Sequence, residues 1–159
     1  ADRYQQPFSL IVAIIDDFDR IAPGRQQALL RDFSWLIIDR LRRAGVRTAF
    51  ISGRRSTATE ARARELGVDL LFNGVREKLP VLEGLLAELG IPADEVAYMG
   101  DDVNDVDCLR AVGLSFAPSD AVREAKAAAW TVTSARGGEG AVREAAELIL
   151  MLNRTAEAP

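Results

Sequence analysis

The segment Glu95–Ala117, EVAYMGDDVNDVDCLRAVGLSFA, decides the fold of this chain. It opens with a short apolar run, turns at Gly100 into an acidic loop, and continues as a helix-like segment. Gly113 closes that segment, and a second apolar run follows at once. Strand, helix and strand in this order predict a βαβ unit with parallel strands. The acidic loop then lies at the carboxyl end of a strand, where open α/β sheets bind their ligands.

The same junction of helix, glycine and apolar run occurs repeatedly along the chain. The glycines of these junctions are Gly45, Gly67, Gly90 and Gly113. Glycine adopts the left-handed conformation without the steric cost of a Cβ, so each would end a helix and reverse the chain. Helices that alternate with short apolar strands predict an α/β fold, a three-layer α/β/α Rossmann-like domain. Its mainly parallel sheet is expected to be covered on both faces.

The spacing of apolar residues also places the individual elements. The expected strands cover residues 10–16, 46–51, 68–73, 95–99, 113–117 and 130–133. The expected helices cover residues 26–44 (approximate bounds), 56–66, 77–89, 104–111, 120–128 and 139–153. Because no linker or low-complexity stretch divides the chain, we expect one domain over residues 1–159, with flexible tails at 1–8 and 154–159.

Composition narrows the classes of protein that fit. The chain has 159 residues, 48% of them hydrophobic and 28% charged, as in an ordinary globular domain. Its formal net charge of −4 provides no basic footprint for a nucleic-acid partner. The single cysteine, Cys108, excludes an internal disulfide. No apolar run of about eighteen residues and no signal segment is present, so we expect a cytoplasmic protein with no membrane partner.

Chemically distinct side chains follow four of the predicted strands. They are the carboxylates of Asp17 and Asp19, the hydroxyl of Ser52, the amine of Lys78, and the carboxylates of Asp101, Asp102 and Asp105. Because the carboxyl ends of parallel strands converge on one crevice, these groups could share a single site. Two acidic clusters, a hydroxyl and an ammonium group in one crevice are suited to a divalent cation and a phosphoryl group.

Each group also has a simpler interpretation. Asp17 and Asp19 could form an acidic turn, with Asp16 as a competitor for the register. Ser52 could cap the next helix, although Ser56 or Thr57 is better placed for that role.

Lys78 could be an ordinary surface lysine. At a helix start, however, it opposes the helix dipole, which favours a use elsewhere. The acidic loop could simply cap a helix, while Asp105, one helical turn after Asp101, could hold Asp101 or Lys78 in place.

These motifs in this order resemble the haloacid dehalogenase superfamily of phosphohydrolases. The resemblance rests on DFD at 17–19, Ser52, Lys78 and GDDVND at 100–105. Within that superfamily the chain is similar to the capless subgroup of 3-deoxy-octulosonate 8-phosphate phosphatases. It is also similar to the phosphatase-like domain of acylneuraminate cytidylyltransferases. The segments AFISGRRS, ELGVDLLFNGVREKL and ARGGEGAVREAAELIL carry this closer likeness. The resemblance implies a domain without a cap.

The resemblance also implies a role for each residue of the motifs. Asp17 would be the nucleophile that forms an aspartyl-phosphate, and Asp19 the general acid and base. Ser52 and Lys78 would hold the phosphoryl oxygens. Mg²⁺ would be bound by Asp17, by the carbonyl of Asp19 and by Asp101.

Other residues would support this centre or bind the substrate, a small phosphorylated sugar acid. Asp102 and Asp105 would not bind the metal themselves but would support the residues that do. Gly53 and Arg54 would line the approach of the phosphate. Residues 136–140 would form a mobile loop near the entrance, with Arg136, Gly137 and Gly138 as the residues that bind substrate.

The chain departs from the superfamily pattern in two places. Arg20 stands where the D-x-D-G motif has glycine, and brings a Cβ and a positive charge to a tight turn. Only RIAPGRQQALL separates Asp19 from Arg31 and Asp32, which is too short for the β-hairpin found there in relatives. That hairpin helps relatives form a tetramer, so the sequence leaves the homo-oligomeric state open.

Three functional interpretations follow. The first is a Mg²⁺-dependent phosphomonoesterase for a sugar-acid phosphate. The second is a phosphatase-like domain with weak or no turnover that serves oligomer assembly, either a natural companion of a cytidylyltransferase or an engineered variant. The apolar run Phe33–Ile38 could then face a partner chain, although simple core packing is the preferred explanation. The third is a receiver-like phosphoacceptor, which the acid/base residue of the D-x-D arrangement disfavours.

Overall fold

The computed structural model describes residues 7–13 and 35–157. Several sequence predictions lie outside these residues: the first motif with Asp17 and Asp19, its neighbour Arg20, and the expected helix start at residues 26–34. Those predictions remain predictions.

The described residues form a six-stranded sheet in which every pair of neighbouring strands is parallel. The strands are β1 (Leu10–Ala13), β2 (Arg47–Ser52), β3 (Leu70–Asn73), β4 (Val96–Met99), β5 (Leu114–Ala117) and β6 (Thr131–Val132). Their order across the sheet is β3-β2-β1-β4-β5-β6. The predicted parallel sheet is therefore confirmed.

The helices are α2 (Trp35–Arg43), α3 (Thr57–Leu66), α4 (Lys78–Leu89), α5 (Val106–Ala111), α6 (Arg123–Ala128) and α7 (Ala141–Ala156). The predicted helix at 104–111 starts instead as a 3₁₀ turn, η3 (Val103–Asp105), and becomes α-helical at Val106. None of the described helices has the length and apolar character needed to cross a membrane.

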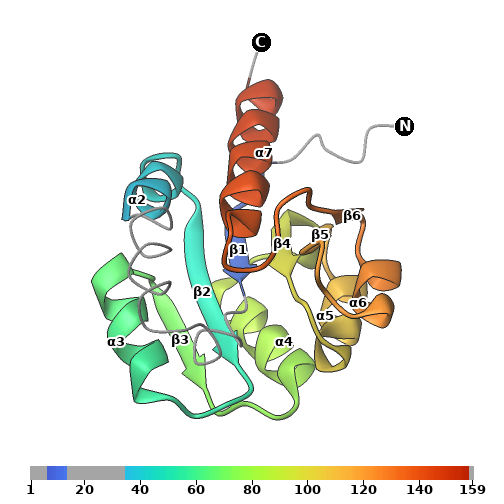
Figure 1. Cartoon of the computed structure of the whole chain (residues 1–159). Helices are drawn as coiled ribbons and strands as arrows, with labels where there is room; N and C mark the ends of the chain where they lie inside the picture. The colour runs from blue at the N-terminus through green and yellow to red at the C-terminus, as the bar shows by residue number, and fades with distance from the viewer. Residues whose placement is uncertain (1–6, 14–34, 158–159) are drawn as a thin grey trace.

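Alternate residues of the strands face two separate cores. Phe50, Ala97 and Met99 pack with residues of α2, α3 and α7, whereas Ile51 and Tyr98 pack with α4, α5 and α6. This period-two alternation is what a strand buried on both faces requires. Figure 1 shows the resulting three layers, with the sheet between the two groups of helices.

Two boundaries differ from the sequence prediction. Phe8 is buried, and its backbone N–H and C=O bond to the side-chain amide of Asn153 at 2.7 and 3.0 Å. Helix α7 continues to Ala156. The predicted tails at 1–8 and 154–159 were therefore wrong for Phe8 and for residues 154–156, because this amide ties the lead into β1 to the last turns of α7.

Glycine acts in two ways at the helix–strand junctions. Gly45, Gly67 and Gly90 have φ values of 75°, 69° and 65°, as predicted for helix ends. Gly113 has no positive φ; a Cβ there would collide with the carbonyl oxygen of Asp94. The prediction of a left-handed glycine at Gly113 was thus wrong. Glycine is needed there because the backbone of Asp94 passes too close to leave room for a Cβ.

Strand order places the functional edge of the sheet. The order reverses between β1 and β4, where Ala13 lies opposite Met99. In open α/β sheets this reversal opens a crevice at the carboxyl ends of the strands. The chain beyond Met99 and the chain beyond Ser52 both leave the sheet at this edge.

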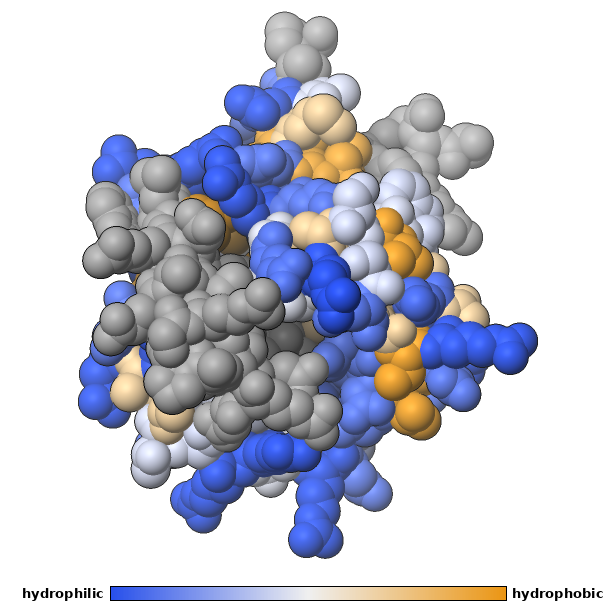
Figure 2. Space-filling view, in the orientation of Figure 1, coloured by the Kyte–Doolittle hydropathy of each residue, from blue (hydrophilic) through white to orange (hydrophobic). Residues whose placement is uncertain are grey.

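The coloured part of the surface in Figure 2 is largely hydrophilic, with small separate hydrophobic areas. Of the predicted apolar run Phe33–Ile38, Ile37 and Ile38 are 4% and 3% exposed and pack in the core with Leu41. Core packing therefore explains this part of the run.

Candidate active site

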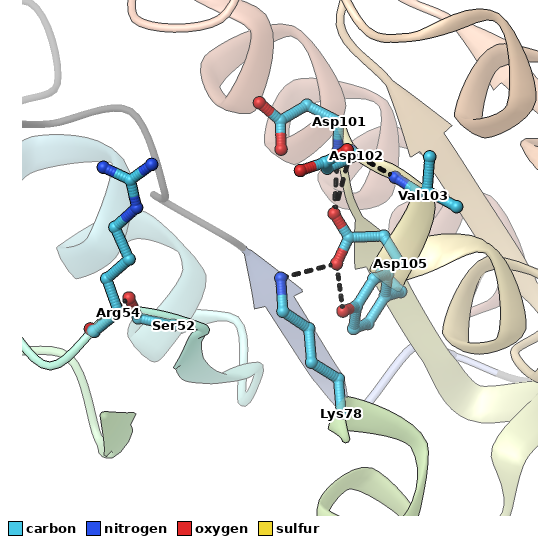
Figure 3. A network of polar contacts seen from close by, with 8 residues as sticks. Ser52, Arg54, Lys78, Asp101, Asp102, Val103 and Asp105 are labelled. Carbon is cyan, nitrogen blue, oxygen red and sulfur yellow. Dashed lines mark hydrogen bonds and ion pairs between the residues drawn. The ribbon is translucent and has the colours of Figure 1, made fainter. Parts of the chain in front are cut away.

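The carboxylate of Asp105 is the centre of a buried polar network beyond β4. Its Oδ1 atom accepts hydrogen bonds from Lys78 Nζ at 2.8 Å and from the Tyr98 hydroxyl at 3.0 Å. Its Oδ2 atom accepts from the backbone N–H groups of Asp101 and Asp102, both at 3.1 Å (Figure 3). Asp105 thus bonds both groups that the sequence offered as alternatives, Asp101 and Lys78. One carboxylate fastens the acidic loop to the start of α4.

A local capping arrangement explains why the acidic loop takes this shape. Asp102 is the N-cap of η3, and its Oδ1 atom accepts from the N–H of Val103 at 2.7 Å. Asp105, three residues later, bonds back to the N–H of Asp102, which completes a capping box. The spacing of Asp102 and Asp105 therefore starts the helix and places the Asp105 carboxylate at the same time.

Gly100 is required by close packing. The sequence suggested that it allows a sharp turn, but it has no positive φ. A Cβ at Gly100 would lie 2.6 Å from Cγ of Asp105, which leaves no room for any side chain. Gly100 thus lets Asp105 pack directly against the backbone at the end of β4.

Lys78 is the first residue of α4 and is 1% exposed, so the ordinary surface position is excluded. The side chains of Lys78 and Asp105 are both fully buried in their ion pair. A buried pair costs desolvation on both sides, and it is tolerated here because Asp105 has four donors. The position of Lys78 is therefore set by its contact with Asp105.

Tyr98 and Cys108 are neutral neighbours of this pair. Burial, followed by the nearby Asp105 carboxylate, raises the pKa of Tyr98 far above its ordinary value. Burial likewise raises the pKa of the Cys108 thiol to about 11. Both groups therefore keep their protons at neutral pH, and Tyr98 acts as a donor to Asp105.

Ser52 and Arg54 form the β2 side of the site (Figure 3). Ser52 is the last residue of β2, is 2% exposed, and donates from its hydroxyl to the Arg54 carbonyl at 3.0 Å. Ser56 is the N-cap of α3 and accepts from the N–H of Thr59, as the sequence predicted. Ser52 therefore does not serve as the cap.

Asn73, at the end of β3, fixes the far end of this loop. Its Oδ1 atom accepts from the N–H of Ser56 at 3.2 Å, and its Nδ2 atom donates to the Ser56 carbonyl at 3.0 Å. Nδ2 also donates to Glu60 Oε1 at 2.9 Å. The segment that carries Gly53 and Arg54 is thus held between Ser52 and Asn73.

The segment that contains Arg136, Gly137 and Gly138 is fastened at its start. The N–H of Gly137 donates to Asp120 Oδ1 at 2.7 Å, and Arg136 Nε lies 3.7 Å from Asp120 Oδ2. The N–H of Val122 in turn donates to the Asp101 carbonyl at 2.9 Å. The sequence suggested a mobile loop, and these contacts show that its first residues are tied to the chain beside Asp101.

Comparisons with known proteins identify relatives of this chain. Residues 71–144 match the family described as haloacid dehalogenase-like hydrolase. The 3-deoxy-D-manno-octulosonate 8-phosphate phosphatase of Yersinia pestis is 44% identical over 103 residues, which are 65% of this chain and 55% of that enzyme. The chain thus matches little more than half the length of this curated relative.

Solved structures extend the likeness to nearly the whole chain. A probable YrbI family phosphatase from Pseudomonas syringae is 35% identical, with a TM-score of 0.79 over 95% of this chain and 89% of that one. The chain belongs to the haloacid dehalogenase superfamily. A second structure, the 3-deoxy-D-manno-octulosonate 8-phosphate phosphatase of Moraxella catarrhalis with magnesium, phosphate and KDO, is 28% identical. Its TM-score is 0.82 over 98% of this chain and 91% of that one.

The structure from Moraxella catarrhalis holds a magnesium ion, so the expected Mg²⁺ ligands of this chain were compared with the described residues. Among the described residues, no group of three or more His, Cys, Asp or Glu side chains forms a metal site. Two of the three expected ligands, Asp17 and Asp19, lie outside the described part of the chain. The third, Asp101, is half-buried and follows β4, whose last residue lies opposite Ala13 at the end of β1; its carboxylate oxygens suit a hard cation such as Mg²⁺. The carboxylate of Asp101 therefore fits Mg²⁺.

Two residues of this haloacid dehalogenase domain escaped the sequence analysis. Tyr98 lies inside an apolar strand, where its hydroxyl gives no pattern of its own. Asn73 ends a strand just before a glycine, a position that is typical of any turn. A polar residue in a run that is otherwise apolar was the only available signal in both cases.

Proposed function

We propose that the chain is a Mg²⁺-dependent phosphomonoester hydrolase that acts on a sugar-acid phosphate of the 3-deoxy-octulosonate 8-phosphate type. The observation that carries the proposal is the buried Lys78–Asp105 pair, which joins a lysine at one strand end to the acidic loop at another. A buried ammonium group at a ligand crevice is suited to a phosphoryl group. Similarity to phosphatases of this substrate class supports the substrate.

The proposed reaction has two steps on Asp17. In the first, a carboxylate oxygen of Asp17 attacks phosphorus, and the sugar leaves as an alkoxide that takes a proton from Asp19. In the second, Asp19 removes a proton from water, which attacks the aspartyl-phosphate and releases inorganic phosphate. Asp17 and Asp19 both return to their starting states.

The described residues bind and orient the phosphoryl group in this scheme. The ammonium group of Lys78 carries three N–H donors, and we infer that it contacts the phosphoryl oxygens while it stays bonded to Asp105. The hydroxyl of Ser52 would turn from the Arg54 carbonyl to a second oxygen. Asp101, with Asp17 and the carbonyl of Asp19, would hold Mg²⁺, which when bound neutralises developing negative charge.

Positive charge beside the crevice supports a sugar acid as the rest of the substrate. Arg54 is exposed at the end of the β2 loop, and Arg136 is largely exposed next to the segment tied to Asp120. Guanidinium groups bind carboxylates in a planar two-point contact. We infer that these two arginines, with Gly53, Gly137 and Gly138, line the approach of the substrate.

A phosphate-release assay tests the proposal. With Mg²⁺ and 3-deoxy-octulosonate 8-phosphate, the protein should release phosphate, and chelation of the metal should abolish release. Asp17→Asn should be inactive, since an amide is not a nucleophile. Asp39→Asn, on an exposed pair with Arg43, is the matched control and should keep full activity. Wild-type turnover in Asp17→Asn, or no turnover in the wild type, would overturn the proposal.

The second candidate is a phosphatase-like domain with little turnover that serves assembly of an oligomer. Arg20 in place of the motif glycine is the observation that favours it. A partner chain would have to cover exposed hydrophobic side chains. Among the described residues the large ones are few: Val103, Val122, Trp130, Val132 and Met151. The same assay separates the candidates, and Arg20→Gly should restore turnover if Arg20 blocks it. Light scattering that shows a monomer at high concentration would contradict the assembly role.

A further inference from the structure

Tyr98 places a hydroxyl group in a completely buried part of the molecule. Its side chain is 0% exposed and packs among apolar residues of α4 and α5 such as Leu82 and Leu109. A buried hydroxyl needs a hydrogen-bond partner, and Tyr98 finds it in Asp105 Oδ1 at 3.0 Å. Phenylalanine would fill the same space without that requirement. The hydroxyl therefore matters for what it does to Asp105.

Two donors of different kinds share the Oδ1 atom of Asp105. Lys78 reaches it with an ammonium group on a flexible four-carbon chain. Tyr98 reaches it with a hydroxyl on a ring that is locked by core packing. Tyr98 therefore supplies the rigid neutral donor to this oxygen, and Lys78 supplies the charged one.

The other oxygen of the same carboxylate holds the acidic loop. Oδ2 accepts from the backbone N–H groups of Asp101 and Asp102. A rotation of the carboxylate would misalign both of these bonds. Whatever fixes Oδ1 therefore also fixes the backbone of the proposed metal ligand Asp101.

We propose that Tyr98 is a positioning residue: its hydroxyl holds the Asp105 carboxylate in line with the acidic loop while Lys78 binds the phosphoryl group. The catalytic part of this inference rests on the proposed function. A phosphoryl group draws the ammonium group of Lys78 toward itself and weakens its bond to Oδ1. Tyr98 keeps that oxygen bonded, so Asp101 and Asp102 stay in place. Its raised pKa keeps the hydroxyl protonated in this role.

Tyr98→Phe tests the inference, with Ser115→Ala as the matched control. Ser115 lies opposite Tyr98 on the neighbouring strand β5 and is 3% exposed. Its hydroxyl accepts from the N–H of Trp130 at 2.9 Å and forms no part of the Asp105 network. Both variants delete one buried hydroxyl, but only Tyr98→Phe removes a donor from Asp105.

Two measurements are made on each variant: steady-state hydrolysis of an aryl phosphate with Mg²⁺, and the amide proton shifts of Asp101 and Asp102 by NMR without substrate. Tyr98→Phe should lower kcat roughly tenfold, the order expected when a charged group loses one hydrogen bond. Its KM should change by less than about twofold, since the loss acts on the transition state. Both amide protons should move upfield as their bonds to Oδ2 lengthen. Ser115→Ala should leave kcat and both amide shifts near wild type.

Unchanged kcat and unchanged amide shifts in folded Tyr98→Phe would overturn the inference, as would equal losses of kcat in both variants. If the wild type releases no phosphate, the proposed function fails, and the amide shifts still decide whether Tyr98 positions Asp105. If Tyr98→Phe does not fold, the wild-type hydroxyl proton decides. The Tyr98 hydroxyl proton should exchange slowly with solvent, and its NMR chemical shift should change in Asp105→Asn. A hydroxyl proton that exchanges rapidly would overturn the inference.

Discussion

On the β4 side of the candidate site Lys78 and Asp105 are buried and bonded to each other, whereas on the β2 side Arg54 lies in a partly exposed loop. Lys78 and Asp105 are 1% and 0% exposed. Beyond Ser52, by contrast, Gly53 is half-buried and Arg54 is exposed. The ion pair holds the charge of Lys78 in one position, whereas the exposed side chain of Arg54 can adapt to a ligand. We infer that Lys78 on the β4 side and Ser52 at the end of β2 serve the phosphoryl group, whereas the loop beyond Ser52 serves the rest of the substrate.

The largest effect should come from removing a charge from the β4 side. Asp105→Ala leaves the Lys78 ammonium group buried without its carboxylate, which should lower the free energy of unfolding by about 3–5 kcal/mol. The control is Asp39→Ala, which breaks the exposed pair with Arg43 at 2.8 Å and should cost less than about 0.5 kcal/mol. Denaturant unfolding measures both. A loss below about 1 kcal/mol for Asp105→Ala would show that the pair does not organise this side.

Close packing at Gly100 should give the next largest effect. Gly100→Ala forces its Cβ against Asp105 and should destabilise the protein by about 1–3 kcal/mol. Gly84→Ala is the matched control, because a Cβ at Gly84 in α4 meets no atom within 4 Å. The control should stabilise the helix by about 0.5–1 kcal/mol. Thermal unfolding of the two variants compares them directly, and equal stabilities would contradict the packing at Gly100.

The β2 side should respond through substrate binding. Asn73→Ala removes both hydrogen bonds to Ser56, so the loop that carries Arg54 loosens. KM should rise about fivefold, with kcat changed less than twofold, as expected for lost uniform binding. Asn153→Ala removes a buried amide far from this loop and should lower stability without raising KM. Steady-state kinetics separates the outcomes; a fall in kcat alone for Asn73→Ala would contradict the division between the two sides.

The smallest effect concerns alkaline pH and the β4 side alone. The pKa of Cys108 rises from 9.0 to about 11 on burial, so the folded state holds the thiol proton more tightly than the unfolded state. The free energy of unfolding should therefore be unaffected by Cys108 below pH 9, and should fall as the pH rises from 9 toward 11. Denaturant unfolding at several pH values measures this slope. Cys108→Ala should make it shallower; an identical slope would contradict the assignment.

The two sides also differ in how far the sequence predicted them. The acidic loop is contiguous, so its spacing predicted a helix start and a contact of Asp105 with Asp101, and left Lys78 as an alternative partner; the structure shows both contacts. The partners of Tyr98 and Asn73 depend on which elements pack together, and no local pattern records that. Gly113 illustrates the same limit, because its constraint comes from the Asp94 carbonyl and not from its own conformation.

The central claim is that the acids of the first motif meet Asp101, Lys78 and Ser52 around one metal ion and one phosphoryl group. A crystal structure with Mg²⁺ and vanadate tests this most directly. The account predicts Mg²⁺ between Asp17 and Asp101, at oxygen distances of about 2.1 Å. Vanadate should contact Lys78 Nζ and Ser52 Oγ. Mg²⁺ or vanadate bound elsewhere, with Asp17 turned away from Asp101, would contradict the account.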